Sequence, residues 1–211
     1  MKARIDRRND TSTAGTAKIT NNDTTAFAGN STTGSAIIVN NGLLSFVDSA
    51  SANGATITNN GATSFSDSSV IGNAVINTMA GGATFIATSA TAGTATITNT
   101  GTSIAPARTI FFDSSVGSAT IVNNAYGATV FWGTSTACQA TITSNADGAT
   151  VFADNSTGGN ARFIINAGGV LDFSTSTGPA GNGKLTAGSI EGAGDVFLGA
   201  NQLTVGSNNL D

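Results

Sequence analysis

The sequence predicts an all-β protein of the β-solenoid type, in which one repeat of about 19–24 residues makes one turn and about eight or nine turns stack. Three observations predict this fold. An Ala-x-Ile unit recurs along the chain, a second apolar position recurs between these units, and the intervening segments are rich in Gly, Asn and Ser without helical periodicity. A repeat of this kind cannot bury its apolar side chains alone, so neighbouring repeats must stack.

The first recurring position is the apolar residue at the centre of the Ala-x-Ile unit. Its members are Ile19, Ile38, Ile57, Ile76, Ile97, Ile121, Ile142 and Phe163. Successive members are separated by 19, 19, 19, 21, 24, 21 and 21 residues. An Ala stands two positions before each member, and a spacing of two places both side chains on one face of a strand. We therefore expect one short strand per turn with these two side chains facing inward.

The second recurring position predicts another strand in each turn. Its members are Phe27, Phe46, Phe65, Ile86, Phe111, Phe131, Phe152 and Phe173. Ile86 belongs here rather than Phe85, because GATFI at 82–86 aligns without gaps to GATVF at 127–131 and 148–152. The distance to the next central Ile is 10 or 11 residues throughout, whereas the other half of the repeat varies from 8 to 14 residues. Insertions are therefore expected in that second half.

Corner residues complete the predicted turn. Six of the eight turns carry Asn three positions after the central apolar residue, where stacked amides can hydrogen-bond and a left-handed backbone is tolerated. Asp48, Asp67, Asp113 and Asp154 stand two positions after the Phe position, as expected for Asx turns. Cys138 takes a place usually held by Gly, so we expect this cysteine at a corner and at least partly exposed.

Composition argues against several kinds of function. The chain of 211 residues is only 9% charged, with a net charge of −4, and four of its eight basic residues fall within the first eight positions. The remainder is acidic, so we expect no nucleic-acid binding. With one cysteine and no histidine, the chain can form no internal disulfide, no Ser-His or Cys-His nucleophile and no His-Cys zinc set. One Asp per turn is too sparse for calcium, and we expect no catalytic residue, metal or cofactor.

The chain divides into three expected regions. Residues 1–10 form a flexible basic N-terminal arm, residues 11–176 form regular β-helix repeats, and residues 177–211 form irregular turns at the truncated end of the same solenoid. Because no capping turns are recognisable, both ends should expose apolar cross-sections and unpaired strand edges, which favour self-association. No apolar run is long enough to predict a membrane span, and no apolar segment follows the basic N-terminus to predict a signal peptide.

A candidate partner surface lies beside the Phe position. If the Phe side chains face inward, their neighbours in the strand face outward, and in four consecutive turns these neighbours are large and apolar. This apolar stripe consists of Phe85, Ile110, Phe112, Val130, Trp132 and Val151. Such a patch usually marks a contact, so we expect it to dock a partner, another copy or a neighbouring part of a longer chain. The alternatives are that the insertion SIAPARTI at 103–110 covers the stripe, or that inside and outside are reversed there.

Several repeat units resemble the repeat region of bacterial autotransporter passenger domains. They are TAGTATITNTG, SSVGSATIVNN and GATVFADNSTGGNA, followed by GSIEGAGDVFLGANQLTVGSNNLD at 188–211, and the resemblance covers about residues 11–211. It implies a right-handed single-stranded parallel β-helix, displayed outside the bacterial outer membrane at the cell surface. It also implies a membrane link only through a barrel domain that this chain lacks. The expected function is that of a non-catalytic structural or adhesive segment, with a protein or a host surface as its partner.

Two other functions are open at this stage. Outward Thr residues flank the central Ile in several turns, and flat Thr ladders are what β-solenoid ice-binding proteins present, although Lys18, Ile37 and Val75 interrupt them. Parallel β-helices also include pectate lyases, which need acids clustered with basic residues on one wall. Asp48 and Asp67 occupy neighbouring turns with no Lys or Arg placed beside them. Ice binding therefore ranks second and polysaccharide lyase activity third.

Overall fold

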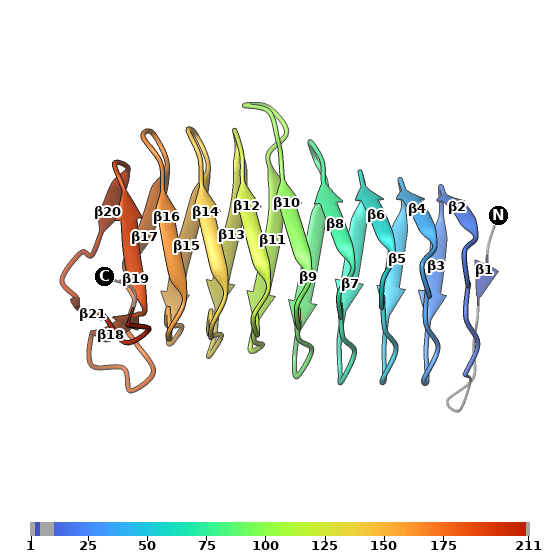
Figure 1. Ribbon diagram of the computed structural model, residues 1–211, viewed down its shortest axis with the longest axis horizontal. Coiled ribbons are helices and arrows are strands. Elements are labelled where there is room, and N and C mark those ends of the chain that lie inside the picture. The colour runs from blue at the N-terminus through green and yellow to red at the C-terminus, as the bar shows by residue number, and fades with distance from the viewer. Residues whose placement is uncertain (1–2, 5–10, 210–211) are drawn as a thin grey trace.

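The computed structural model describes residues 3–4 and 11–209, which form a parallel β-solenoid with no helix among them. Turns follow one another along the rod from its N-terminal to its C-terminal end (Figure 1). Each regular turn contributes one strand to each of two large parallel sheets and one bridged residue to a third face. The prediction of an all-β solenoid with one repeat per turn is confirmed.

The first sheet has ten strands and contains the Phe position. Its order is β1-β3-β5-β7-β9-β11-β13-β15-β17-β20. The strands are β1 (Ala3–Arg4), β3 (Thr24–Phe27), β5 (Leu43–Phe46), β7 (Ala62–Phe65), β9 (Ala83–Ala87), β11 (Ala107–Phe112), β13 (Gly127–Trp132), β15 (Ala149–Asp154), β17 (Val170–Ser176) and β20 (Asp195–Phe197).

The second sheet has nine strands and contains the central Ile position. Its order is β19-β16-β14-β12-β10-β8-β6-β4-β2. The strands are β2 (Lys18–Asn21), β4 (Ile37–Asn40), β6 (Thr56–Asn59), β8 (Val75–Thr78), β10 (Thr96–Asn99), β12 (Thr120–Asn123), β14 (Thr141–Ser144), β16 (Arg162–Ile165) and β19 (Ser189–Gly192).

The third face is a ladder of single-residue bridges. It runs through Thr13, Thr32, Ser51, Val70, Thr91, Ser115, Thr136 and Thr157. In the last turns it continues as the two-stranded sheet of β18 (Lys184–Ala187) and β21 (Gln202–Val205). Thr186 of β18 lies beside Thr157, since their hydroxyl oxygens are 3.3 Å apart. Residues 184–205 therefore continue all three faces of the solenoid.

Two expectations concern the ends of the chain. The N-terminal arm falls largely outside the described residues, although Ala3 and Arg4 pair with β3 as strand β1. At the C-terminal end, Val196 and Val205, which pair with the buried Leu171 and Ala187, are exposed, as expected for an apolar cross-section. Self-association through these ends stays a prediction.

The inward Phe side chains stack along the axis of the rod. Phe46 and Phe65 lie with ring centroids 4.4 Å apart and an interplanar angle of 5°. Phe131 and Phe152 repeat this arrangement at 4.4 Å and 4°. Ile86 occupies the same column, paired with Phe65 and Phe111 on either side, as the gap-free alignment predicted. Burial of each such side chain stabilises the fold by roughly 1.5–3 kcal/mol.

An inner ladder of buried polar side chains runs beside the Phe stack, and the sequence analysis missed it. The Nδ2 of Asn21 donates to Oδ1 of Asn40 at 2.7 Å, and Nδ2 of Asn40 donates to Oδ1 of Asn59 at 2.9 Å. Asn99 and Asn123 form the same contact at 2.8 Å. The signal was an Asn two positions after the central Ile, which alternation places inside the strand rather than at the corner.

Buried Thr residues complete the inner ladder. The hydroxyl of Thr109 donates to Oδ1 of Asn99 at 2.7 Å, and the hydroxyl of Thr129 donates to Oδ1 of Asn123 at 2.9 Å. These contacts explain why Gly-Ala-Thr recurs at the start of the second strand. Its Thr faces the Asn, and a Cβ in place of Gly148 would collide with the carbonyl oxygen of Asn123.

An outer Asn ladder forms at the next position, as predicted. Asn60 donates to Asn41, and Asn41 donates to Asn22, both at 2.8 Å. The expected left-handed backbone at this position is wrong, because none of these residues has a positive φ. Positive φ occurs instead in the corner before the Ala, for example at Cys138 with φ 51°. Cys138 is half-buried at that corner, which confirms its predicted place.

Candidate functional site

The apolar stripe lies on the outward face of the ten-stranded sheet, across β9, β11, β13 and β15. One row is formed by Phe85, Ile110, Val130 and Val151, which are paired in register from strand to strand. A second row contains Phe112 and Trp132, which are paired with each other. Phe85, Phe112 and Trp132 are 39%, 47% and 45% exposed, and Ile110, Val130 and Val151 are half-buried.

Inside and outside are not reversed in these strands. Phe111 and Phe131 are fully buried, and Thr109 points inward to its bond with Asn99. Since successive side chains of a strand alternate between faces, Phe112 and Trp132 must point to solvent. The stripe is thus fixed by the same inward contacts that build the core.

The insertion before β11 does not cover the stripe. Residues 101–106 form a tight loop closed by a bridge between Thr102 and Ala105, and Ile104 at its tip is 94% exposed. The backbone N–H of Gly81 donates to the carbonyl of Ala105 at 3.2 Å, which fixes the loop beside the preceding corner. This loop extends beyond its neighbours at the β10–β11 corner (Figure 1), whereas Phe112 ends β11 at the opposite edge of the sheet.

A row of small side chains borders the stripe at the start of the strands. Ala83, Ala128 and Ala149 face outward in this row, and Arg108 stands among them, paired with Ala83 on one side and Ala128 on the other. Arg108 is exposed and makes no ion pair with any residue of the described ranges. This row was not predicted from the sequence, although its members stand two positions before those of the first row.

Polar side chains limit the stripe along the rod. In the first row, Ser64 of β7 precedes Phe85, and Asp172 of β17 follows Val151. The carboxylate of Asp172 accepts a bond from the backbone N–H of Ser174 at 2.8 Å. The outward apolar surface therefore covers four strands and stops at both sides.

The corner Asp residues bind neighbouring turns rather than their own. Oδ2 of Asp48 accepts from the N–H of Gly29 at 3.0 Å, and Oδ2 of Asp154 accepts from the N–H of Gly133 at 3.1 Å. The expected Asx turns are thus replaced by bonds between turns. With φ 59° at Asp48, the backbone there is left-handed. These carboxylates hold the corners of the solenoid together.

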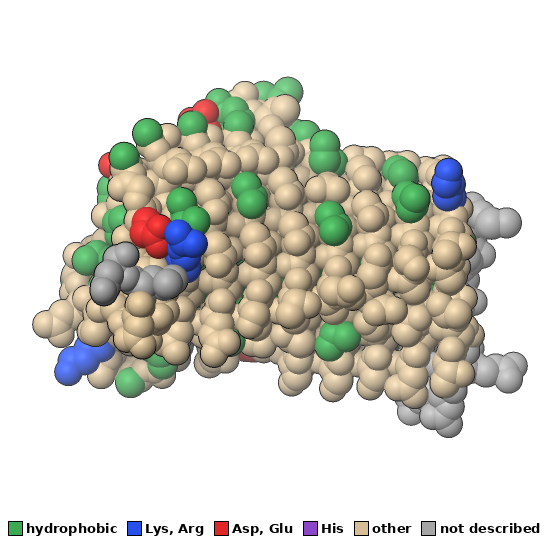
Figure 2. All heavy atoms as spheres, viewed as in Figure 1, with side chains coloured by type: hydrophobic (Ala, Val, Ile, Leu, Met, Phe, Trp, Pro, Cys, Tyr) green, Lys and Arg blue, Asp and Glu red, His purple; other side chains and the backbone are tan. Residues whose placement is uncertain are grey.

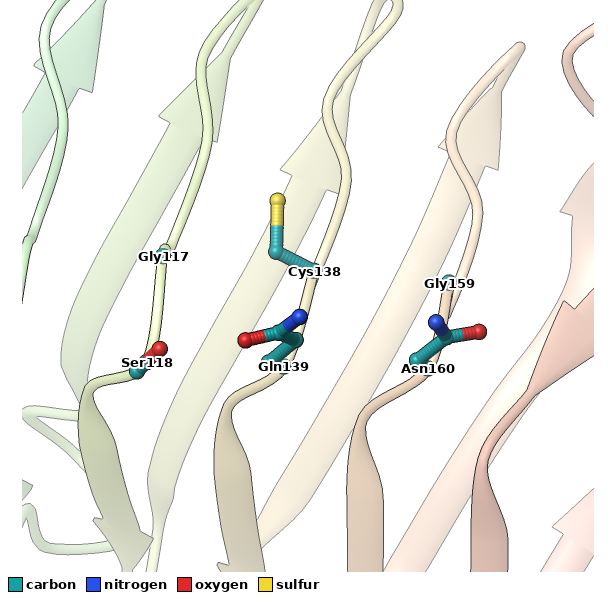
Figure 3. A pocket seen from close by; sticks show the side chains of 6 residues that line it. All are labelled: Gly117, Ser118, Cys138, Gln139, Gly159 and Asn160. Atoms are coloured by element: carbon teal, nitrogen blue, oxygen red, sulfur yellow. The ribbon is translucent and has the colours of Figure 1, made fainter. Parts of the chain in front are cut away.

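A shallow depression lies at the corner before β12, β14 and β16 (Figure 3). It is lined by Gly117, Ser118, Cys138, Gln139, Gly159 and Asn160, equivalent pairs from three successive turns. The Cys138 side chain stands apart from the amide groups of Gln139 and Asn160, which are the other large groups in the view. The lining residues include no carboxylate and no basic side chain beside the thiol.

The outward Thr residues of the nine-stranded sheet form a short ladder. Thr96, Thr120 and Thr141 are paired in register over three strands. Val75 precedes them and Arg162 follows them in the same row. On the face of the rod seen in Figure 2, hydrophobic side chains are scattered and charged side chains are few. A regular Thr surface is therefore limited to three turns.

Within residues 3–4 and 11–209, no helix has the length and apolarity needed to cross a membrane. Over the same residues, no group of three or more acidic or cysteine side chains is placed to hold a metal ion. Comparison of the chain with family models, with curated proteins and with solved structures gave no match.

Proposed function

We propose that this chain is a non-catalytic structural and adhesive segment of a protein displayed at the bacterial cell surface, as the resemblance to autotransporter passenger repeats implies. The apolar stripe is the observation that carries the proposal. Phe85, Phe112 and Trp132 keep between 39% and 47% of their surface exposed on a rigid sheet. A contiguous apolar surface of this kind marks a contact site in soluble proteins.

The rest of the rod supports a spacer role. Its turns are joined by continuous parallel backbone pairing and by the two Asn ladders, so the stripe is held at a fixed position along the rod. The corner carboxylates take part in bonds between turns. Each of these features serves stacking, which is what a stalk requires.

Ice binding is less well supported by the surface. A flat Thr ladder does occur, but it includes only Thr96, Thr120 and Thr141 before Arg162 interrupts it. Absence of thermal hysteresis in a solution of the purified chain would remove this alternative. Release of unsaturated products from pectin would instead favour the third reading, a polysaccharide lyase.

Surface display tests the proposal directly. The chain is fused to an export system that presents it on bacterial cells, and attachment of these cells to epithelial monolayers is counted. Display of the Phe112→Ser, Trp132→Ser double variant should reduce attachment to the level of cells without the chain. The matched control is Thr96→Ser, Thr120→Ser on the nine-stranded sheet, which should attach like wild type. Equal attachment by the stripe variant and wild type would contradict the adhesive role.

A further inference from the structure

We propose that the apolar stripe docks a second copy of this chain face to face, so that two rods lie side by side. This inference rests on the proposed function, which makes the stripe a contact surface, and it goes further by naming the partner. The proposal of a second copy is supported by the size, shape and charge of the outward side chains on β9 to β15. Each of these properties is self-complementary under one symmetry operation.

The surface around the stripe is regular enough to pack against a copy of itself. Pairing is in register from Arg108 to Phe112 on β11 and from Ala128 to Trp132 on β13. Equivalent side chains therefore repeat about every 4.8 Å along the rod and form straight rows. Sheets with such faces pack with their backbones about 10 Å apart.

The rows differ in size in a way that matches a two-fold axis parallel to the rod. At the end of the strands the outward residues are large on β11 and β13, Phe112 and Trp132, and small on β9 and β15, Ala87 and Ala153. At the start of the strands, β13 and β15 carry the small residues Ala128 and Ala149. A two-fold axis along the rod reverses the strand direction of the second copy. Trp132 then faces Ala128 of the second copy, and Ala128 faces its Trp132. The middle row, which includes Val130, faces its own equivalent.

The same operation gives Arg108 a partner. This exposed side chain has no ion-pair partner among the described residues of its own chain. In the paired arrangement it faces Phe112 of the second copy, and Asp113 follows that Phe. A guanidinium over an aromatic ring and beside a carboxylate is favourable. A protein of another kind would have to supply both the small row and the acid independently.

The size of the surface limits the strength of the dimer. Four strands spaced about 4.8 Å apart and about six residues long give a footprint of roughly 400 Å² per copy. A stable complex usually buries about 800 Å² on each partner, so this contact should be weak and concentration-dependent. Many copies displayed on one surface would be needed to populate it fully.

Exchange of the large and the small residue tests the arrangement. Sedimentation velocity of the full chain, from about 5 to 500 µM, should show a reversible rise from monomer to dimer. Trp132→Ala and Ala128→Trp should each weaken dimerisation at least about tenfold, the first by lost contact and the second by a clash of two Trp side chains. The double variant Ala128→Trp, Trp132→Ala restores one large residue against one small one and should return to within about threefold of wild type.

The Ala128→Trp variant separates this proposal from general hydrophobic association. It enlarges the exposed apolar surface, so association that equals or exceeds that of wild type would overturn the proposal. Thr96→Trp on the nine-stranded sheet is the matched control and should dimerise like wild type. Far-ultraviolet circular dichroism of every variant checks that the β-sheet content is retained.

The adhesion assay distinguishes failure of this inference from failure of the proposed function. A chain that stays monomeric at all concentrations, while its attachment to epithelial cells still depends on Phe112 and Trp132, would overturn the second copy as the partner and leave the adhesive role standing. A chain that neither dimerises nor attaches through the stripe would overturn both. Dimerisation with the size exchange behaving as expected supports the proposal.

Discussion

The turns before residue 74 and those after residue 92 share one backbone plan but differ in the side chains that line it. In the first group the central Ile recurs every 19 residues, and in the second every 21 or 24. The outward first row of the ten-stranded sheet carries Ser45 and Ser64 in the first group, and Ile110, Val130 and Val151 in the second. The large outward apolar side chains of this row are therefore confined to one part of the rod.

The Phe stack, the inner ladder and the outer Asn ladder are all interrupted in the turn that separates these groups. Ile86 stands where the other seven turns have Phe, so the stack from Phe27 to Phe65 ends and a new one begins at Phe111. Thr78 replaces Asn in the inner ladder, and Met79 replaces Asn in the outer ladder. Backbone pairing continues unbroken, since β8 pairs with both β6 and β10.

Backbone and side chains therefore join the turns of the solenoid separately. Parallel backbone pairing is nearly uniform along the rod, so it gives no turn a special strength. Stacked rings and amides differ from turn to turn, so the coupling that side chains provide between neighbouring turns varies along the rod. We therefore expect the two groups of turns to unfold as separate units that meet at residues 74–92, as repeat proteins do where a nearest-neighbour contact is weak.

The largest expected effect comes from truncating a stacked ring in each group. Phe46→Ala and Phe131→Ala should each destabilise their own group by about 3–5 kcal/mol, because each removes a fully buried ring between two others. Trp132 is the one tryptophan of the chain and reports on the second group. Urea unfolding is followed by its fluorescence and by far-ultraviolet circular dichroism.

The two variants should act on different signals. Phe131→Ala should shift the Trp132 transition to lower urea, whereas Phe46→Ala should shift only the part of the circular dichroism change that does not coincide with the Trp132 transition. An equal shift of Trp132 fluorescence by Phe46→Ala would show that the rod unfolds as one unit. The interruptions of the ladders would then not weaken the coupling between the two groups of turns.

The next largest effect concerns the inner ladder. Asn59→Ala removes the bonds from its amide to the carbonyl of Ala83 at 2.8 Å and to the hydroxyl of Thr84 at 3.2 Å. It also removes one acceptor of the Asn40 amide, which keeps its bond to the carbonyl of Ala62. Leaving such buried groups without partners should cost about 1–3 kcal/mol. The free energy of unfolding of the first group, from urea titration, measures the loss.

Thr78→Ala is the matched control at the interruption. The hydroxyl of Thr78 contacts Thr84 alone at 3.0 Å, so its removal should cost less than removal of Asn59. If both variants lose the same stability, the amide ladder adds nothing beyond an ordinary buried hydroxyl.

The sequence predicted the columns of the solenoid because each is a single residue type at a repeated spacing. Alignment of GATFI with GATVF correctly assigned Ile86, and not Phe85, to the inward Phe position. The outward stripe followed from the alternation of side chains along a strand. The inner ladder was missed for a physical reason. Asn is usually a surface residue, and only the pairing of its amide with equivalent amides above and below allows it inside a core.

Other features depended on contacts that no local pattern contains. The corner Asp residues bond to neighbouring turns of the solenoid. The Asx-turn pattern predicts bonds within one segment and therefore gave the wrong partners. Whether the insertion covered the stripe depended on the direction of one loop. Its attachment to Gly81 and its exposed Ile104 were not readable from composition.

A smaller effect is expected from repair of the outer ladder. Met79 is 38% exposed at the position where Asn60 precedes it and Thr100 follows it. Met79→Asn places an amide between them and should add about 0.5–1 kcal/mol to the stability of the junction. The separation between the dichroism and Trp132 transitions in urea should narrow.

Met79→Ala is the control for loss of the exposed side chain. It should leave the separation of the two transitions as it is in wild type. Narrowing by both variants would attribute the effect to removal of Met79, and the idea that amides couple the two groups of turns would fail.

The smallest expected effect lies at the last turns, where Ile165 has replaced the inner Asn and an ion pair joins the strands on the outside. Nε and Nη2 of Arg162 on β16 donate to the two carboxylate oxygens of Glu191 on β19, each at 2.7 Å. Both side chains are 41% exposed, so solvent screens their attraction and the contribution to stability is small.

The contribution of the Arg162–Glu191 ion pair to stability depends on pH, and the direction of this dependence follows from the pKa of Glu191. The hydrogen bond from Arg162 holds the pKa of Glu191 below its usual value of 4.5. A carboxyl whose pKa is lowered in the folded state contributes stability that is present above its unfolded pKa and is lost as the pH falls through its folded pKa. Glu191→Gln should therefore be less stable than wild type at about pH 6, and the difference should shrink as the pH falls below 4.5, through the lowered pKa of Glu191. Thermal unfolding of both proteins across this range measures the difference. A constant gap at all pH values would mean that the charge of the Glu191 carboxylate does not contribute to joining β16 to β19.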